Sequence, residues 1–169
     1  MFIPLSVMCH SMGNRVLMSY AKHALVAKRF ENVYMVAADV WEEVFNTRVI
    51  SNTWNQPFWN YWNEWKDSGL KLSQMLKDGG KIHIINYSGD LALIASQYGE
   101  NRRTRLGRYG LAPQLNRGRV HPDVVEKLVG YDMDEFKEDV IKASPMTKHS
   151  YYAMPKLLKY YNSTMDASA

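Results

Sequence analysis

Three short apolar runs, each followed by residues with helical spacing, constrain the fold of this chain most. The runs are residues 2–9, 33–38 and 81–87, and each is short enough for a buried strand. Helices are expected after them: from Ser11 to Lys28, from Asp39 through Phe45, and from Leu91 to about Tyr98. This alternation predicts an α/β fold in which a parallel sheet carries helices on both faces.

The remaining elements complete one domain, residues 1–161. Residues 65–77 have helical spacing, and Asp78-Gly79-Gly80 is expected to end that helix, since Gly commonly follows a helix end. Residues 124–131 are a candidate last strand, and residues 151–161 a closing helix. The tail, residues 162–169, is small and polar, and we expect it to be flexible.

Charge argues against a nucleic-acid partner. The formal net charge is +4, and the positive residues are dispersed, apart from the cluster Arg102, Arg103, Arg105 and Arg108. That cluster lies in a glycine-punctuated stretch, and the chain has no zinc-finger spacing or basic zipper region.

The cysteine count, the apolar runs and the histidine spacing bear on the compartment of the protein and on whether it binds a metal. The single cysteine, Cys9, allows no internal disulfide, which fits a reducing compartment. No apolar run approaches a membrane span of about 20 residues, and no signal peptide is recognised, which favours the cytoplasm without assigning it. The histidines lack zinc-site spacing, so no metal or other cofactor is expected. The oligomeric state is left open.

The sharpest chemical signal is Cys9-His10-Ser11-Met12-Gly13, at a strand-to-helix junction. It fits the nucleophile-elbow pattern G-x-S-x-G, with Cys9 in place of the first glycine. A serine there projects its hydroxyl beyond the sheet, and the Met12 N–H, at a helix start, is a candidate oxyanion donor. The alternative is that Ser11 only caps the helix, since serine is a favoured N-cap residue.

A nucleophilic serine needs a base, and the chain supplies the order serine, acid, histidine. His149 precedes the closing helix and is the candidate general base. Asp90 follows the third strand and is the favoured acid, because its Ser-Gly-Asp turn leaves the side chain free to project. Asp39 also follows a strand and is the alternative acid. Either aspartate could instead cap the next helix, a role compatible with catalysis.

Several segments resemble a family of predicted α/β-hydrolases of unknown function. They are CHSMGNRVL (9–17), VAADV followed by Phe45, YSGDLALIAS (87–96), RLGRYG (105–110) and KHSYY (148–152), and the likeness covers most of residues 3–155. The resemblance implies an eight-stranded, mostly parallel sheet and a triad of Ser11, Asp90 and His149, which supports Asp90 over Asp39. It implies an esterase-like class without assigning the substrate.

Two features depart from that family. Only one strand precedes the elbow here, whereas the family has several, one of them followed by the loop that donates the second oxyanion N–H. The chain is therefore expected to be the C-terminal part of the fold, lacking the N-terminal strands. The aromatic insert, residues 46–64, falls where such hydrolases often carry a cap. Its aromatic side chains either line a substrate pocket or pack the cap against the body: Trp54, Phe58, Trp59 and Trp62.

Two functions follow from these observations. The first is a serine hydrolase that cleaves an ester, thioester or lipid-like acyl bond of a small molecule through an acyl-enzyme on Ser11. The second is a non-catalytic or truncated α/β-hydrolase-like protein with an interaction role. Labelling of Ser11 by a serine-directed probe distinguishes them.

Overall fold

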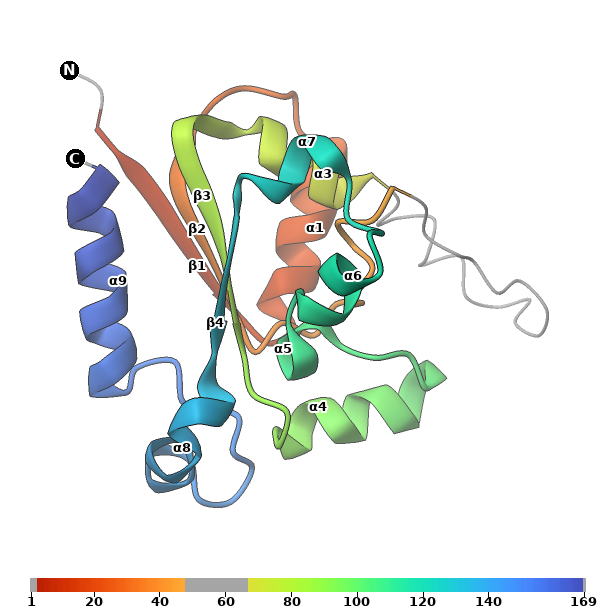
Figure 1. Cartoon of the computed structure of the whole chain (residues 1–169), viewed down its shortest axis with the longest axis vertical. Coiled ribbons are helices and arrows are strands. Elements are labelled where there is room, and N and C mark those ends of the chain that lie inside the picture. The colour runs from red at the N-terminus through yellow and green to blue at the C-terminus, as the bar shows by residue number, and fades with distance from the viewer. Residues whose placement is uncertain (1–2, 48–66, 169) are drawn as a thin grey trace.

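A four-stranded parallel sheet forms the centre of the molecule (Figure 1). The structure is a computed structural model that describes residues 3–47 and 67–168, so the four aromatic residues named above lie outside the described residues. The strands pair in sequence order: β1 (Leu5–His10), β2 (Phe30–Val36), β3 (Leu76–Asn86) and β4 (Leu128–Asp132). This sheet confirms the α/β class.

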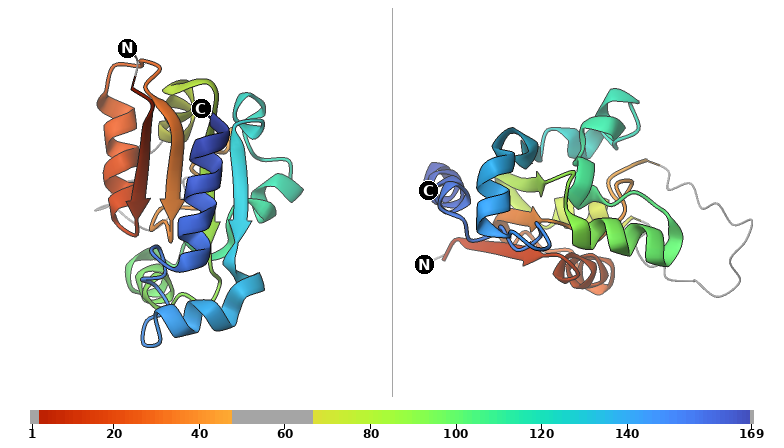
Figure 2. Two further views of the ribbon diagram at one scale, coloured as in Figure 1. Left: turned by 90° about the vertical axis from the view of Figure 1, so that its left-hand side faces the viewer. Right: turned by 90° about the horizontal axis from the view of Figure 1, so that it is seen from below.

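Helices cover both faces of the sheet, as expected (Figure 2). The described helices are α1 (Gly13–His23), α3 (Ser68–Gln74), α4 (Leu91–Ser96), α5 (Leu106–Tyr109), α6 (Ala112–Asn116), α7 (Pro122–Val125), α8 (Lys137–Ala143) and α9 (Pro155–Ser168). A π-helical turn, Gln97–Asn101, extends α4, and a 3-10 turn, Met133–Phe136, precedes α8.

Alternate residues of β2 build the two halves of the core. Val33 and Met35 pack in the cluster that includes Leu17 of α1. Tyr34 and Val36 pack in the other cluster, with Leu157 of α9. Since successive side chains of a strand point to opposite faces, α1 and α9 must lie on opposite sides of the sheet, as Figures 1 and 2 show.

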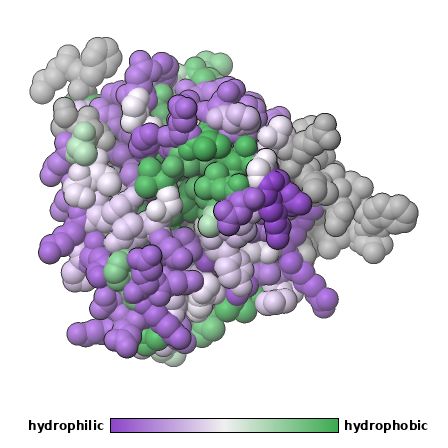
Figure 3. Space-filling model, in the orientation of Figure 1, coloured by the Kyte–Doolittle hydropathy of each residue, from purple (hydrophilic) through white to green (hydrophobic). Residues whose placement is uncertain are grey.

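The outer surface is mostly hydrophilic on the face drawn in Figure 3, except for an apolar area over the region of β4 and α7. Val125 of α7 is 41% exposed there, and Leu128 of β4 is half-buried. β4 and β1 are the two edge strands, so each leaves one side of its backbone unpaired within the sheet.

The helix expected from Asp39 through Phe45 is wrong. The segment forms turns between two isolated antiparallel bridges, Trp41 with Arg105 and Asn46 with Val120. A further backbone bond runs from Glu42 N to Thr104 O (3.1 Å). Backbone N–H and C=O groups of this segment therefore bond to distant residues, and are not available for the internal hydrogen bonds of a helix.

The Gly-Gly pair does not end a helix either. Helix α3 ends at Gln74, and Gly79 and Gly80 lie inside β3. The pairing of β2 with β3 jumps there, and Gly79 has a φ of 78°. A Cβ on Gly80 would lie 3.0 Å from the Glu31 carbonyl oxygen, so glycine serves an irregular strand with close backbone approach.

The C-terminal part of the chain is more helical than expected. The first residues of the expected strand 124–131 belong to α7 and the turn after it, and α8 had no counterpart in the sequence reading. The residues expected to form a flexible tail continue α9 through Ser168. The Thr164 hydroxyl holds this end, bonded to Tyr34 Oη at 2.6 Å and to the Tyr160 carbonyl at 2.9 Å.

Candidate active site at the carboxyl edge of the sheet

The three candidate triad residues follow three of the parallel strands. Ser11 comes directly after β1, Asp90 follows β3, and His149 follows β4 beyond α8. The carboxyl ends of parallel strands meet at one edge of a sheet, the lower edge in Figure 1. The topology alone therefore brings together residues that are far apart in sequence.

Ser11 occupies a strained turn between β1 and α1. Its φ is 54°, a left-handed value that costs a non-glycine residue about 1–3 kcal/mol. The Ser11 N–H donates to the Val36 carbonyl (3.0 Å), and the Ser11 carbonyl accepts from the Asp39 N–H (3.2 Å). These bonds to the β2 end and the residues after it hold the turn in place.

The side chain of Asn14 is a second brace for the turn. It is fully buried, and its Nδ2 donates to the carbonyls of Cys9 (3.0 Å) and Ser11 (3.1 Å). Cys9 stands where the elbow pattern has glycine, and a Cβ placed on Gly13 would lie 3.9 Å from the Cys9 Cβ. That distance is an ordinary van der Waals contact, so a small side chain at position 9 is compatible with the turn.

Met12 begins the helical turn after Ser11 and is 60% exposed. Its carbonyl accepts from the Arg15 N–H (2.9 Å), while its own N–H has no acceptor within the described part of the chain. An unpaired N–H at a helix start is suited to binding a negative oxygen.

Asp90 and His149 form a direct hydrogen bond. Asp90 is fully buried, and its Oδ2 lies 2.6 Å from Nδ1 of His149. The other oxygen, Oδ1, accepts from the Leu93 N–H (3.0 Å) and caps α4. A carboxylate fixes a proton on the facing Nδ1, so Nε2 of His149 is left as the basic nitrogen.

The loop that carries His149 is held at several points. Ser144 is buried, and its hydroxyl oxygen accepts from the N–H groups of His149 and Ser150, both at 3.2 Å. The Leu91 N–H, next to Asp90, donates to the Thr147 carbonyl (3.0 Å). The acid and the histidine loop are thus tied together by backbone as well as by side chains.

His149 meets the elbow through His10, the residue before Ser11. The ring centroids of His10 and His149 are 4.6 Å apart. No hydrogen bond joins the Ser11 hydroxyl to His149 among the described residues. The structure therefore pairs Asp90 with His149 and brings His149 beside the elbow, without a bond to the hydroxyl itself.

Asp39, the alternative acid, has other partners. Its Oδ1 accepts from Arg105 Nε and its Oδ2 from Arg15 Nη2, both at 2.8 Å. The Ser96 hydroxyl also donates to Oδ1 at 2.8 Å. Arg105 is 1% exposed, and burial lowers the pKa of its guanidinium. Both carboxylate oxygens of Asp39 are thus committed to a buried ion network.

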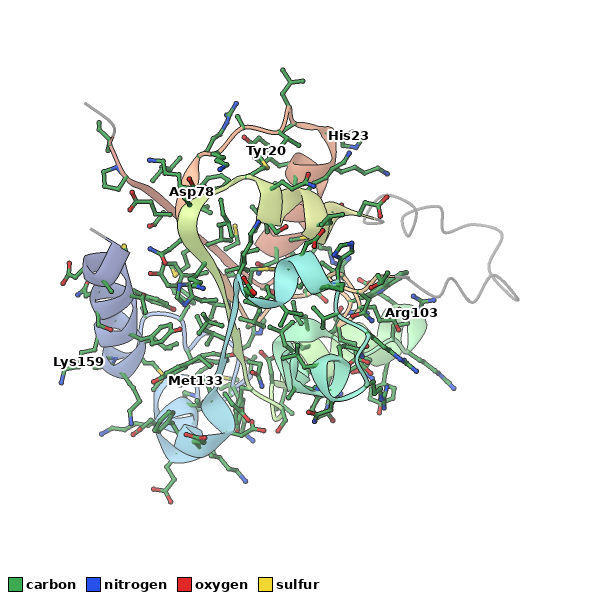
Figure 4. All side chains as sticks on the ribbon, turned by 45° about the horizontal axis from the view of Figure 1, so that its top comes forward. Tyr20, His23, Asp78, Arg103, Met133 and Lys159 are labelled. Carbon is green, nitrogen blue, oxygen red and sulfur yellow. The ribbon has the colours of Figure 1, made fainter. Side chains whose placement is uncertain are left out.

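The arginine cluster mostly serves packing. Besides Arg105, Arg108 is buried, and it donates to Gln97 Oε1 at 2.7 Å. The Arg103 guanidinium lies 3.9 Å from the centre of the Trp41 ring, at the position labelled in Figure 4. These contacts explain three of the four arginines by intramolecular interactions.

In the described ranges, residues 3–47 and 67–168, no group of three or more His, Cys, Asp and Glu side chains could hold a metal ion. No helix there is both long and apolar enough to cross a membrane. Cys9 is half-buried, and burial raises the pKa of its thiol.

The family model described as "Alpha/beta hydrolase of unknown function (DUF900)" matches residues 2–164. The chain belongs to this family. The match covers the four described strands and all but the last residues of α9, which confirms the resemblance inferred from the sequence. Comparison with curated proteins finds no match, and comparison with solved structures finds none either.

Sequence reasoning did not find the parts of this α/β-hydrolase that hold the site together. It gave no catalytic or positioning role to His10, Asn14 or Ser144. The adjacency of His10 to Ser11 was the one available signal, because the contact with His149 spans 139 positions of sequence.

Proposed function

We propose that this α/β-hydrolase is a serine hydrolase that cleaves an ester, thioester or lipid-like acyl bond of a small molecule. The observation that carries the proposal is the 2.6 Å bond from Asp90 to Nδ1 of His149, at the sheet edge that also presents Ser11. A buried carboxylate on one ring nitrogen leaves the other nitrogen to accept a proton.

The chemistry would proceed in two steps. Ser11 Oγ attacks the substrate carbonyl while His149 Nε2 takes the hydroxyl proton, and His149 then returns that proton to the leaving group. Water, activated by the same nitrogen, then hydrolyses the acyl group on Ser11. Asp90 keeps the proton on Nδ1 and stabilises the positively charged imidazole during both transfers.

The developing oxyanion would be bound by the Met12 N–H. Met12 is an exposed residue directly before α1, and its N–H has no acceptor within the described residues. One such donor is typically worth about 10²- to 10³-fold in rate. The four aromatic residues Trp54, Phe58, Trp59 and Trp62 remain a prediction for the substrate pocket.

A fluorophosphonate probe tests the proposal, because it reacts with an activated serine and needs no knowledge of the substrate. The wild-type protein should be labelled at Ser11, and Ser11→Ala should not be labelled at all. Ser150→Ala is the matched control, since this exposed serine neighbours His149 and its hydroxyl has no described partner. Absence of labelling on folded wild-type protein contradicts the proposal.

The alternative, a non-catalytic protein with an interaction role, is favoured by the open edge of the sheet. On β1, Leu5 is 48% and Met8 is 46% exposed, although strands of parallel sheets are usually covered on both faces. Unlabelled but folded wild-type protein that self-associates or captures a partner through β1 would support this second function.

A further inference from the structure

His10 contacts two aromatic rings at the elbow. Its ring centroid is 4.6 Å from that of His149 and 4.6 Å from that of Tyr152, with interplanar angles of 43° and 47°. Its Nε2 also lies 3.0 Å from the His149 carbonyl oxygen. His10 therefore contacts both the ring and the backbone of the candidate base.

The contact with the carbonyl fixes where His10 carries its proton. A carbonyl oxygen can only accept, so Nε2 of His10 must be the donor. The charged or titratable groups facing His10 are His149, Asp90 and Tyr152. Burial is the main cause that lowers the pKa of His10, and His149 lowers it further, while the carbonyl bond and Asp90 oppose the shift.

We propose that His10 is a positioning residue for His149, holding the base by a hydrogen bond to its carbonyl and by contact with its ring. This inference rests on the proposed function, because it assigns His10 to the same reaction. Tyr152 also contacts the His10 ring, at a centroid distance of 4.6 Å.

A single hydrogen bond does not fix an imidazole. The Asp90 bond anchors Nδ1 but leaves the ring able to swing about that point, which would move Nε2 relative to Ser11. The His10 ring limits the swing, and its N–H limits movement of the backbone from which the ring projects. Such preorganisation matters, because a displacement of about 1 Å can cost about 100-fold in rate.

A neutral His10 also favours the proton transfer to His149. When His149 accepts the Ser11 proton it becomes a cation, and a second cation at a ring distance of 4.6 Å would oppose that step. A neutral ring that still donates one N–H avoids the repulsion and keeps the hydrogen bond.

The test uses the full chain and three variants. His10→Gln keeps an amide that can donate to the His149 carbonyl, His10→Phe keeps a ring without a donor, and His10→Ala removes both. His23→Gln is the matched control, because His23 is exposed at the end of α1, as labelled in Figure 4. Fluorophosphonate labelling of Ser11 is measured against probe concentration, to separate the maximal rate from the half-saturating concentration.

We expect His10→Ala to lower the maximal labelling rate about 100-fold with an unchanged half-saturating concentration. The Gln and Phe variants should fall between Ala and wild type, and His23→Gln should match wild type. In ¹⁵N-histidine NMR, the proton on Nδ1 of His149 should broaden in His10→Ala and stay sharp in wild type, an effect that a purely structural role would not produce in folded protein.

Two outcomes overturn the inference. If His10→Ala labels at the wild-type rate with a sharp Nδ1 proton, His10 does not position the base, although labelled Ser11 keeps the proposed function. If labelling of Ser11 falls only in proportion to the loss of folded protein, with an unchanged rate per folded molecule, the role of His10 is structural. Unlabelled wild-type protein removes the proposed function and this inference together.

Discussion

Asp39 and Asp90 follow neighbouring parallel strands, both are buried, and yet their partners differ completely. Asp39 is paired with the guanidinium groups of Arg15 and Arg105. Asp90 is paired with the imidazole of His149 and with the backbone N–H of Leu93. The two carboxylates are nearly equivalent in the sequence pattern and unlike in the structure.

The partner decides what each carboxylate can do. A guanidinium stays protonated at any ordinary pH, so the Asp39 network cannot take part in proton transfer and serves to join α1, β2 and the arginine segment. An imidazole nitrogen can accept and release a proton, so the Asp90 pair can take part in proton transfer. The comparison predicts that loss of Asp90 reduces activity and that loss of Asp39 reduces stability.

The largest expected effect comes from Asp90→Asn. The Asn carbonyl can still accept from the Leu93 N–H and cap α4, but its amide would face Nδ1 of His149 with a donor. The imidazole would then carry its proton on Nε2 and could not accept one from Ser11. We expect the rate of fluorophosphonate labelling to fall about 10³- to 10⁴-fold with the fold retained by circular dichroism. A rate within tenfold of wild type would remove Asp90 from the proposed triad.

Asp39→Ala should reverse this pattern. It leaves Arg105, which is 1% exposed, without its closest carboxylate, and breaking a buried ion pair typically costs about 3–5 kcal/mol. The free energy of unfolding, measured by denaturant titration, should fall by about that amount, while the labelling rate per folded molecule falls far less than in Asp90→Asn.

Asp139→Ala is the matched control for Asp39→Ala. Its ion pair with Lys156 is exposed and should be worth less than about 1 kcal/mol. Equal losses of stability in the two variants would show that the buried Asp39 ion pairs stabilise the fold no more than an exposed ion pair does.

His83 extends the comparison to a buried group without a charged partner. Its Nδ1 is 2.7 Å from Tyr160 Oη and its Nε2 2.9 Å from Asn32 Oδ1, and burial, with a smaller effect of Lys81, lowers its pKa to about 4. An unfolded histidine titrates near pH 6.5, so the unfolded state binds the extra proton first as the pH falls. The stability from neutral His83 is present above about pH 6.5 and is lost between there and about pH 4, by about 3 kcal/mol.

His83→Gln tests this effect, because glutamine cannot titrate in that range. Unfolding of wild type and variant by denaturant at pH 7 and pH 4.5 should show a smaller acid-induced loss of stability in the variant. Parallel losses in the two proteins would mean that His83 does not cause the acid sensitivity.

The sequence predicted the elements that depend on local signals and missed those that depend on contacts with distant residues. The cores of β1, β2 and β3 and the start of α4 were found, because short apolar runs and a capping aspartate are local signals. The segment from Asp39 through Phe45 was misjudged, because its turns depend on bridges to Arg105 and Val120. The end of α9 was missed because its anchor is Tyr34, in a strand 130 positions away.

The candidate site shows the same division. Ser11 was found from a local motif, and Asp90 and His149 from chain order and the resemblance to a family. Composition and spacing alone did not separate Asp90 from Asp39. The two aspartates differ because Asp39 is paired with Arg105, and nothing in the sequence indicated which residue Arg105 would contact. The contacts of His10 and Ser144 with the His149 segment depend on the folded chain, and the position of His10 next to Ser11 was the one local signal for them.

The contact between His10 and His149 closes a loop of 139 residues. Closing so long a loop carries an entropy cost that no short-range contact offsets, so the sheet must form before the two ends can meet. We therefore expect the candidate site to assemble late in folding, so that labelling of Ser11, under the proposed function, would report completion of the native state more faithfully than helix content does.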